Sequence, residues 1–344
     1  MQDSLFGDEP EAPPPPKKPE PAPRKRRGGV EAAALQDEWL ALRERLPSAL
    51  RLGTSSWSYP GWIGSVWARE YSQSLLAKRG LPAYCEHPLL RTVSLDRAFY
   101  QPLLAAQYAQ YATQVPADFR FLVKAPSLVA DAMLRGEDGR SLQFNASFLD
   151  PTLAAEEFAI PARDGLRSKL GALVFQLSPM PSSLTADRAA LLHRLSAMLA
   201  ALPDLREQAP DAVVAIEVRN PELLNRDFAA VLREHRATYC LGLHAKMPAI
   251  EDQLPTLRAL WPGPLVCRWN LHRKHGAFGY EEAKRLYGDF NQIVDADPDT
   301  RSALARVIRG TTGAGHAAYV TLGNKAEGSA PLSVFALAAA VASA

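Results

Sequence analysis

Several charged residues stand at the ends of apolar segments that are typical of buried strands. In VVAIEVR, residues 213–219, the alternation places Glu217 and Arg219 on one side and Val214, Ile216 and Val218 on the other. Lys124 and Arg268 hold similar positions in two other segments. Buried charges need a partner, water or a ligand. Because guanidinium and ammonium groups bind phosphates and carboxylates, this set predicts an anion site, with Glu217 as its general acid or base.

Further polar residues extend this candidate site. They also end or follow strand-like segments, and they are Asp96, Gln176, His244, Asn270 and Asn324. Simpler structural interpretations remain open: Glu217 paired with Arg219 or Arg268 would brace the fold, Lys124 would reach solvent from a strand end, and His244 would be a hydrogen-bonded core residue. The number of polar groups at successive strand ends favours a ligand site over bracing alone.

Two other chemistries fit these residues less well. A glycosidase needs two convergent carboxylates, and Gln176 stands where the second one would be expected. A metal site would have to draw on His244, Glu217 and Asp96, while the other clustered histidines lie beside basic residues in the HRKH segment 272–275. We therefore expect no metal and no cofactor.

An aromatic loop follows the first strand-like segment. Its residues Trp57, Tyr59 and Trp62 are predicted to lie above the charged groups, where they would stack on a base or a sugar of the ligand. The alternative is a hydrophobic lid that packs on the neighbouring AFYQP segment, residues 98–102.

The order of elements predicts the fold that positions these groups. Strand-like segments alternate with helical patterns, at residues 50–55, 92–97, 119–124, 172–177, 213–219, 238–244, 265–270 and 318–323. A strand followed by a helix, eight times, is typical of an α/β protein of the (β/α)8 TIM-barrel class, whose ligand face lies at the carboxyl ends of the strands. A doubly wound sheet is disfavoured, because no glycine-rich dinucleotide fingerprint follows the first strand. Residues 134–158 are predicted to be an insertion.

The composition indicates the compartment and the classes of partner to expect. The 344 residues are 47% apolar with a net charge of +2, so the whole molecule has no strong attraction for nucleic acid or membranes, although a local basic site remains possible. The three cysteines are widely spaced, which indicates buried thiols in a reducing compartment. The sequence shows no apolar leader and no stretch of about 18 apolar residues, so we expect a cytoplasmic protein without a membrane partner.

The chain divides into three predicted parts. Residues 1–29 are rich in Pro, Lys and Arg and are predicted to form a disordered tail. Residues 30–47 are predicted to form a leading helix, with Leu35, Trp39, Leu42 and Leu46 on its apolar face. Residues 48–344 are predicted to form the barrel.

The first residues of the tail carry a short motif. Gln2, Leu5 and Phe6 resemble the Gln-x-x-Leu-Phe peptide with which bacterial replication and repair proteins bind the sliding clamp. A glutamine amide would bond the rim of a groove while the two apolar side chains fill its pocket, and the tail would act as a tether. The alternative is that these residues fold back on the barrel or bind nothing.

The motifs together resemble one known family. LRLGTSSWSYPGW, TVSLDRAFYQP, AIEVRNPELLN, VCRWNLH and YVTLGNKAEGSAPLSVFAL occur in the order of the YecE-like family, domain of unknown function 72, and the likeness spans roughly residues 50–343. The resemblance implies a TIM barrel and no established reaction. The chain departs from the family where Ser94-Leu95-Asp96 replaces the common Glu-Ile-Asn, and where KAPSLVADA lacks the usual Thr-His.

These observations predict a metal-independent enzyme or ligand-binding barrel that acts on an anionic molecule, either phosphorylated or nucleotide-like. The alternative is a non-catalytic accessory protein that associates with nucleic acid and is recruited to the replication clamp. Whether the barrel catalyses a reaction is left open by the sequence.

Overall fold

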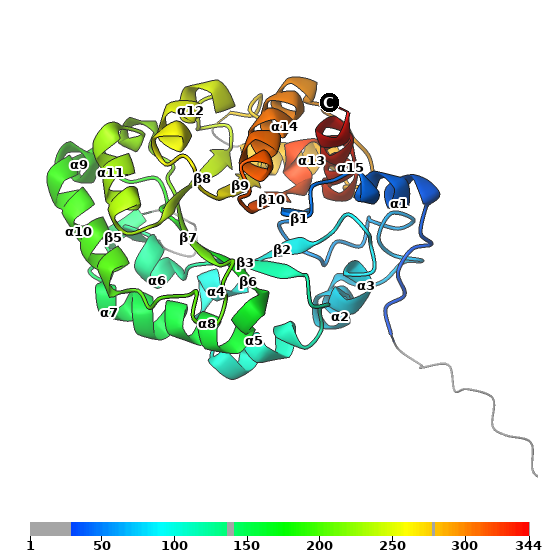
Figure 1. The fold of residues 1–344 in the computed structure, drawn as a ribbon, viewed down its shortest axis with the longest axis horizontal. Coiled ribbons are helices and arrows are strands. Elements are labelled where there is room, and N and C mark those ends of the chain that lie inside the picture. Colours follow the sequence, from blue (N-terminus) through cyan, green and yellow to red (C-terminus); the bar gives the residue numbers. More distant parts are fainter. Residues whose placement is uncertain (1–28, 136–140, 277–278, 344) are drawn as a thin grey trace, which may run out of the picture.

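Eight parallel strands close into a barrel in this computed structural model, which describes residues 29–135, 141–276 and 279–343 (Figure 1). Around the barrel the strands follow the order β1-β10-β9-β8-β7-β6-β3-β2. Their bounds are β1 Leu50–Thr54, β2 Thr92–Leu95, β3 Arg120–Lys124, β6 Leu170–Gln176, β7 Val213–Glu217, β8 Thr238–Leu243, β9 Leu265–Trp269 and β10 Ala318–Leu322. Each of the eight predicted segments forms one of these strands, so the predicted (β/α)8 barrel is confirmed.

Helices connect the strands and surround them (Figure 1). They are α1 Asp37–Glu44, α2 Gln73–Arg79, α3 Leu81–Tyr84, α4 Arg97–Tyr100, α5 Ala105–Ala112, α6 Ser127–Ala130, α7 Pro151–Ala154, α8 Ile160–Leu166, α9 Ser182–Ala186, α10 Arg188–Ala201, α11 Arg226–Glu234, α12 Ile250–Ala259, α13 Gly279–Tyr287, α14 Pro298–Gly313 and α15 Ala330–Ala342. Short π or 3-10 turns cover Ala155–Ala159, Arg167–Lys169, Pro221–Leu223 and Asn324–Ala326. Among the described residues, no helix is both long and apolar enough to cross a bilayer.

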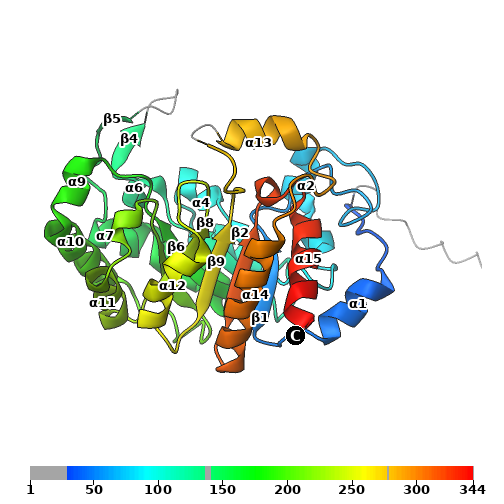
Figure 2. The same cartoon turned by 90° about the horizontal axis from the view of Figure 1, so that it is seen from above.

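The predicted insertion lies outside the barrel. It contains an antiparallel hairpin of β4 Met133–Arg135 and β5 Ser141–Phe144, which forms a sheet of its own. Figure 2 shows this hairpin and α13 at the same end of the barrel. Because β3 pairs directly with β6, the insertion leaves the closure of the barrel unchanged.

The barrel interior has an apolar layer directly below a polar one. Buried interior side chains include Leu122, Val174, Ala215 and Val266 on four different strands. Since side chains two positions apart on a strand face the same way, the next interior position on each strand lies one layer nearer the carboxyl end. Those positions hold Lys124, Gln176, Glu217 and Arg268. The alternation in the sequence thus builds a polar layer on an apolar base.

The leading helix is shorter than predicted. It begins at Asp37, so Leu35 precedes it and is 53% exposed, whereas Trp39 and Leu42 are buried. Residues 31–33 instead run beside the aromatic loop, where Ala33 N donates to Val66 O and Ala68 N donates to Glu31 O. Pairing with this loop overrides the helical tendency of the segment. The tail at 1–28, with Gln2, Leu5 and Phe6, lies outside the described residues.

Candidate functional site

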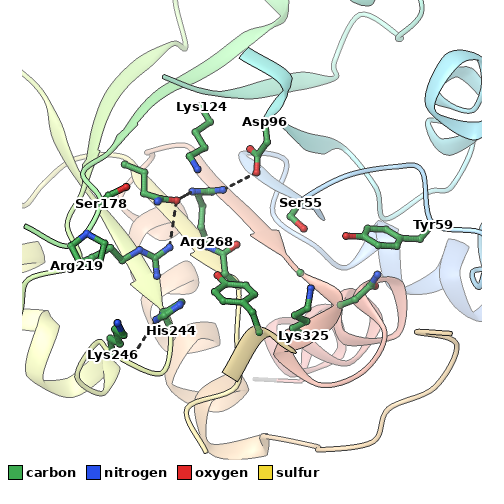
Figure 3. A pocket seen from close by; sticks show the side chains of 16 residues that line it. Ser55, Tyr59, Asp96, Lys124, Ser178, Arg219, His244, Lys246, Arg268 and Lys325 are labelled. Atoms are coloured by element: carbon green, nitrogen blue, oxygen red, sulfur yellow. Dashed lines mark hydrogen bonds and ion pairs between the residues drawn. The ribbon is translucent and has the colours of Figure 1, made fainter. Parts of the chain in front are cut away.

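A cavity of about 620 Å³ opens at the carboxyl ends of the barrel strands (Figure 3). Nine of the residues predicted for the site line it, namely Tyr59, Asp96, Lys124, Gln176, Arg219, His244, Arg268, Asn270 and Asn324. Three others do not line it, namely Trp57, Trp62 and Glu217. The structure thus brings together residues from most of the barrel strands.

Glu217 is fully buried beneath the cavity and holds two arginines. Its Oε1 lies 2.5 Å from Arg219 Nη2, and its Oε2 lies 2.7 Å from Arg268 Nη1. Burial by itself would raise the pKa of Glu217, but Arg219 and Arg268 outweigh it and hold the pKa below its ordinary value. This carboxylate is therefore ionised and engaged on both oxygens. Its position argues against the predicted acid–base role and agrees with the bracing interpretation.

The pairing of Glu217 with Arg268 crosses a strand. Glu217 lies on β7 and Arg268 on β9, and Gly242 of β8 stands between them, opposite Arg268 in register. A Cβ atom at position 242 would lie 3.4 Å from Glu217 Oε1 and 3.5 Å from its Cγ. These are ordinary van der Waals distances, so a methyl group would fit here, and the Glu217 side chain packs directly against this position of β8.

Arg268 makes more polar contacts than Arg219, although both keep an unpaired nitrogen within the described residues. Besides Glu217, Arg268 donates to Gln176 Oε1 at 2.9 Å and to Asp96 Oδ2 at 3.2 Å. Burial would lower the pKa of Arg268, but Glu217 and Asp96 raise it above its ordinary value. Arg219 Nη1 has no hydrogen-bond partner within the described parts of the chain. Arg268 Nε is likewise buried without a partner there, so each guanidinium keeps an unpaired nitrogen, which in Arg219 is the terminal Nη1.

Lys124 ends β3 and is 9% exposed. Its Nζ lies 3.5 Å from the centre of the Phe99 ring. Burial and the neighbouring Arg268 lower the pKa of Lys124 to about 8, against opposing effects of Asp96 and Glu217. About one amine in ten is therefore neutral at pH 7.

His244 offers a neutral donor. Its Nδ1 accepts the backbone N–H of Lys246 at 3.1 Å, so in the neutral ring the proton lies on Nε2. Burial, with the nearby Arg219, lowers the pKa of His244 to about 4. The ring lies 5.3 Å from that of Tyr280, which also lines the cavity.

Asn324 presents a fixed amide to the cavity. Its Oδ1 accepts from Trp62 Nε1 at 3.0 Å and from Ala330 N at 2.9 Å. Its buried Nδ2 has no hydrogen-bond partner among the residues that the structure describes. Because both bonds are to the oxygen, the orientation of the amide is set and Nδ2 remains available to a ligand.

The aromatic loop supports the site more than it covers it. Trp62 is 1% exposed and orients Asn324, and Trp57 is 8% exposed with its ring packed edge-on against Tyr111. Neither residue lines the cavity, so their contact with a ligand stays a prediction that this geometry does not favour. Tyr59 alone of the three lines the cavity.

Sequence reasoning missed several lining residues, among them Ser55, Ser178, Lys246, Tyr280 and Lys325. Ser55 directly follows β1, and Lys325 lies three residues after the end of β10, so a search of the three residues beyond each strand end would have found both. With Lys246 and Lys325 included, five cationic side chains line the cavity, against Asp96 as the lining carboxylate and Glu217 below it.

The clustering needed for a metal site does not occur in the described structure. No group of three or more His, Cys, Asp or Glu side chains there is placed to hold an ion. Of the residues once considered for a metal, Asp96 and Glu217 are both bound to Arg268.

Residues 51–344 match the family model described as "Protein of unknown function DUF72". The chain belongs to this family. The resemblance drawn from the sequence motifs is thereby confirmed. No curated protein matches the chain.

Two solved structures of DUF72 family proteins are similar to this chain. A DUF72 family protein from Enterococcus faecalis is 18% identical, with 86% of this chain and 96% of that chain covered and a TM-score of 0.55. Another, from Thermotoga maritima, is 18% identical, with 84% of this chain and 97% of that chain covered and a TM-score of 0.49. At 18% identity, the similarity to the Enterococcus faecalis protein concerns the fold alone.

Proposed function

We propose that this DUF72 protein binds an anionic small molecule, phosphorylated or nucleotide-like, in the cavity at the carboxyl end of its barrel, as a metal-independent enzyme or a ligand-binding protein. The observation that carries the proposal is the charge of the lining: five cationic side chains surround a cavity with one lining carboxylate. Since cavities of one sign raise the local concentration of oppositely charged ligands, this lining favours anions.

The free hydrogen-bonding groups point to the same ligand class. Arg219 Nη1 and Asn324 Nδ2 are buried donors without partners in the described chain. The neutral ring of His244 adds a third donor. Phosphate and carboxylate oxygens only accept hydrogen bonds, so such a ligand would satisfy all three.

The cavity is large enough for a ligand bigger than an inorganic ion. About 620 Å³ is within the range of small-molecule sites, roughly 300–1,000 Å³. Tyr59 and Tyr280 lie on its wall and would contact the organic part of the ligand.

Calorimetric titration with inorganic phosphate, pyrophosphate, a sugar phosphate and a nucleoside monophosphate tests the proposal. We expect at least one phosphorylated compound to bind, and the double variant Lys246→Gln with Lys325→Gln to weaken it about tenfold or more, because two charge-assisted bonds are lost. The exposed Lys78, outside the cavity, gives the matched control Lys78→Gln. Equal affinity in both variants, or no binding to any of these compounds, would remove the proposal. A single-stranded oligonucleotide in the same series tests the nucleic-acid alternative.

A further inference from the structure

Lys124 differs from the other cations of the cavity because it is buried without a counter-ion. Arg219 and Arg268 share Glu217, while Lys246 is exposed and Lys325 is half-buried. No ion pair or hydrogen bond of Lys124 Nζ occurs within the described part of the chain. A buried ammonium in this position is costly unless something neutralises it.

The nearby carboxylates are already engaged. Glu217 holds an arginine on each oxygen. Asp96 accepts from Arg268 on Oδ2 and from Ser94 Oγ on Oδ1. The Phe99 ring attracts the charged amine, but a ring face supplies only about 0.5–2 kcal/mol. The neighbourhood of Lys124 is therefore arranged for an amine that loses its proton readily.

The amine also faces the space that a ligand would fill. Lys124 lines the cavity, and Figure 3 shows its side chain pointing into the middle of the site, with Arg219 and Lys246 to one side and Lys325 to the other. An anionic group held by these outer cations would bring the rest of the ligand next to the Lys124 amine. A buried amine beside another cation is a recurring form of nucleophilic lysine.

We propose, on the basis of the proposed anion site, that Lys124 is a nucleophile that forms an imine with the carbonyl carbon of an anionic aldehyde or ketone. With a pKa of about 8, roughly one amine in ten is neutral at pH 7. The nitrogen lone pair attacks the carbonyl carbon, a C–N bond forms, and the π pair moves to the oxygen, which takes a proton as the nitrogen loses one. The hydroxyl takes a second proton from solvent and leaves as water while the nitrogen lone pair forms C=N. The protonated imine that results returns one proton to solvent when it becomes neutral, and no oxidant or reductant is needed.

Borohydride trapping tests this step on the full-length protein. Glycolaldehyde phosphate and glyoxylate serve as anionic probes, and uncharged glycolaldehyde serves as the control. Intact mass measures the reduced adduct and peptide mapping locates it. We expect at least tenfold more adduct on Lys124 than on any other lysine, and at least tenfold more with an anionic probe than with glycolaldehyde. Comparison of the two anionic probes shows whether a phosphate or a carboxylate is preferred.

Two variants complete the test. Lys124→Met should abolish the adduct, and Lys78→Met should retain it. Adducts spread evenly over the lysines, or mapped to a residue other than Lys124, would overturn the imine. If inorganic phosphate or pyrophosphate still binds in that case, the anion site stands without the imine, and if neither binds, both proposals fail.

Discussion

Lys124 carries its charge in a place where a charge reduces stability. Replacing it by Met should stabilise the protein at pH 7 by on the order of 2–3 kcal/mol, because burial lowers its pKa from 10.5 to about 8. Below pH 8 the amine is charged in both the folded and the unfolded chain, so the folded state bears the full free-energy cost of the buried charge. Between pH 8 and 10.5 the folded chain gives up the proton first, and the advantage of Met declines. Urea unfolding of the native protein and the Met variant at pH 7 and at pH 10 measures the difference in unfolding free energy at each pH.

The control for this prediction is the exposed lysine of α2. Lys78→Met should leave the free energy of unfolding nearly unchanged at both pH values. A Lys124→Met protein that is less stable than the native one at pH 7 would mean that the ammonium is well compensated in its site. The same result would weaken the case for a reactive amine, since natural sites that sacrifice stability commonly do so for function.

Only part of the environment of Glu217 could be predicted from the sequence. The alternation in 213–219 identified Glu217 and Arg219 as neighbours on one side of a strand. It could not show that Glu217 reaches across β8 to Arg268, because that depends on the order of the strands around the barrel. This tertiary contact favours the bracing interpretation of Glu217, and its acid–base role stays a prediction that the two ion pairs disfavour.

At the scale of elements, the loop after β1 and the turn after β10 act together. Trp62 of the loop donates to Asn324, which begins the turn Asn324–Ala326. Trp62→Phe should weaken anion binding by about fivefold to tenfold while the barrel stays folded, because the amide loses one of the two bonds that orient it. Titration with the best phosphorylated ligand, together with circular dichroism, checks this expectation.

Trp57→Phe is the matched control, since it removes a similar volume from the same loop. Trp57 Nε1 has no hydrogen-bond partner in the described structure, so this variant loses packing alone. Equal losses of affinity in the two variants would show that loop packing matters and the bond to Asn324 does not.

Helices and strands could be predicted where they depend only on the sequence of their own segment. Short apolar segments predict all eight barrel strands, and the two-residue alternation within each segment predicts which side chains face the barrel interior. The leading helix was predicted to start at residue 30, but residues 31–33 pair with the aromatic loop, and that partner lies more than 30 residues along the chain, from Ala33 to Val66. Local periodicity carries no information about such a partner.

At the scale of the whole molecule, the predicted clamp motif would link the barrel to DNA replication. The full-length protein should bind purified bacterial sliding clamp at micromolar affinity, about −8 kcal/mol, and replacement of Gln2, Leu5 and Phe6 by Ala should remove that binding. Surface plasmon resonance measures the affinity, and Asp8→Ala is the control outside the motif. Equal, weak binding by all three proteins would exclude the clamp as a partner.

The pairing of β1 with β10 has a consequence for synthesis. Leu50 faces Ala318 in this pair, 268 positions later (318 minus 50). At about 5–20 residues per second, a ribosome would take roughly 15–50 seconds to travel that distance. During this time one edge of β1 has no neighbouring strand, and open edges invite pairing with other chains. The nascent chain thus has its greatest exposure to misassembly before its last strand emerges, and a chaperone that shields β1 would matter most in that interval.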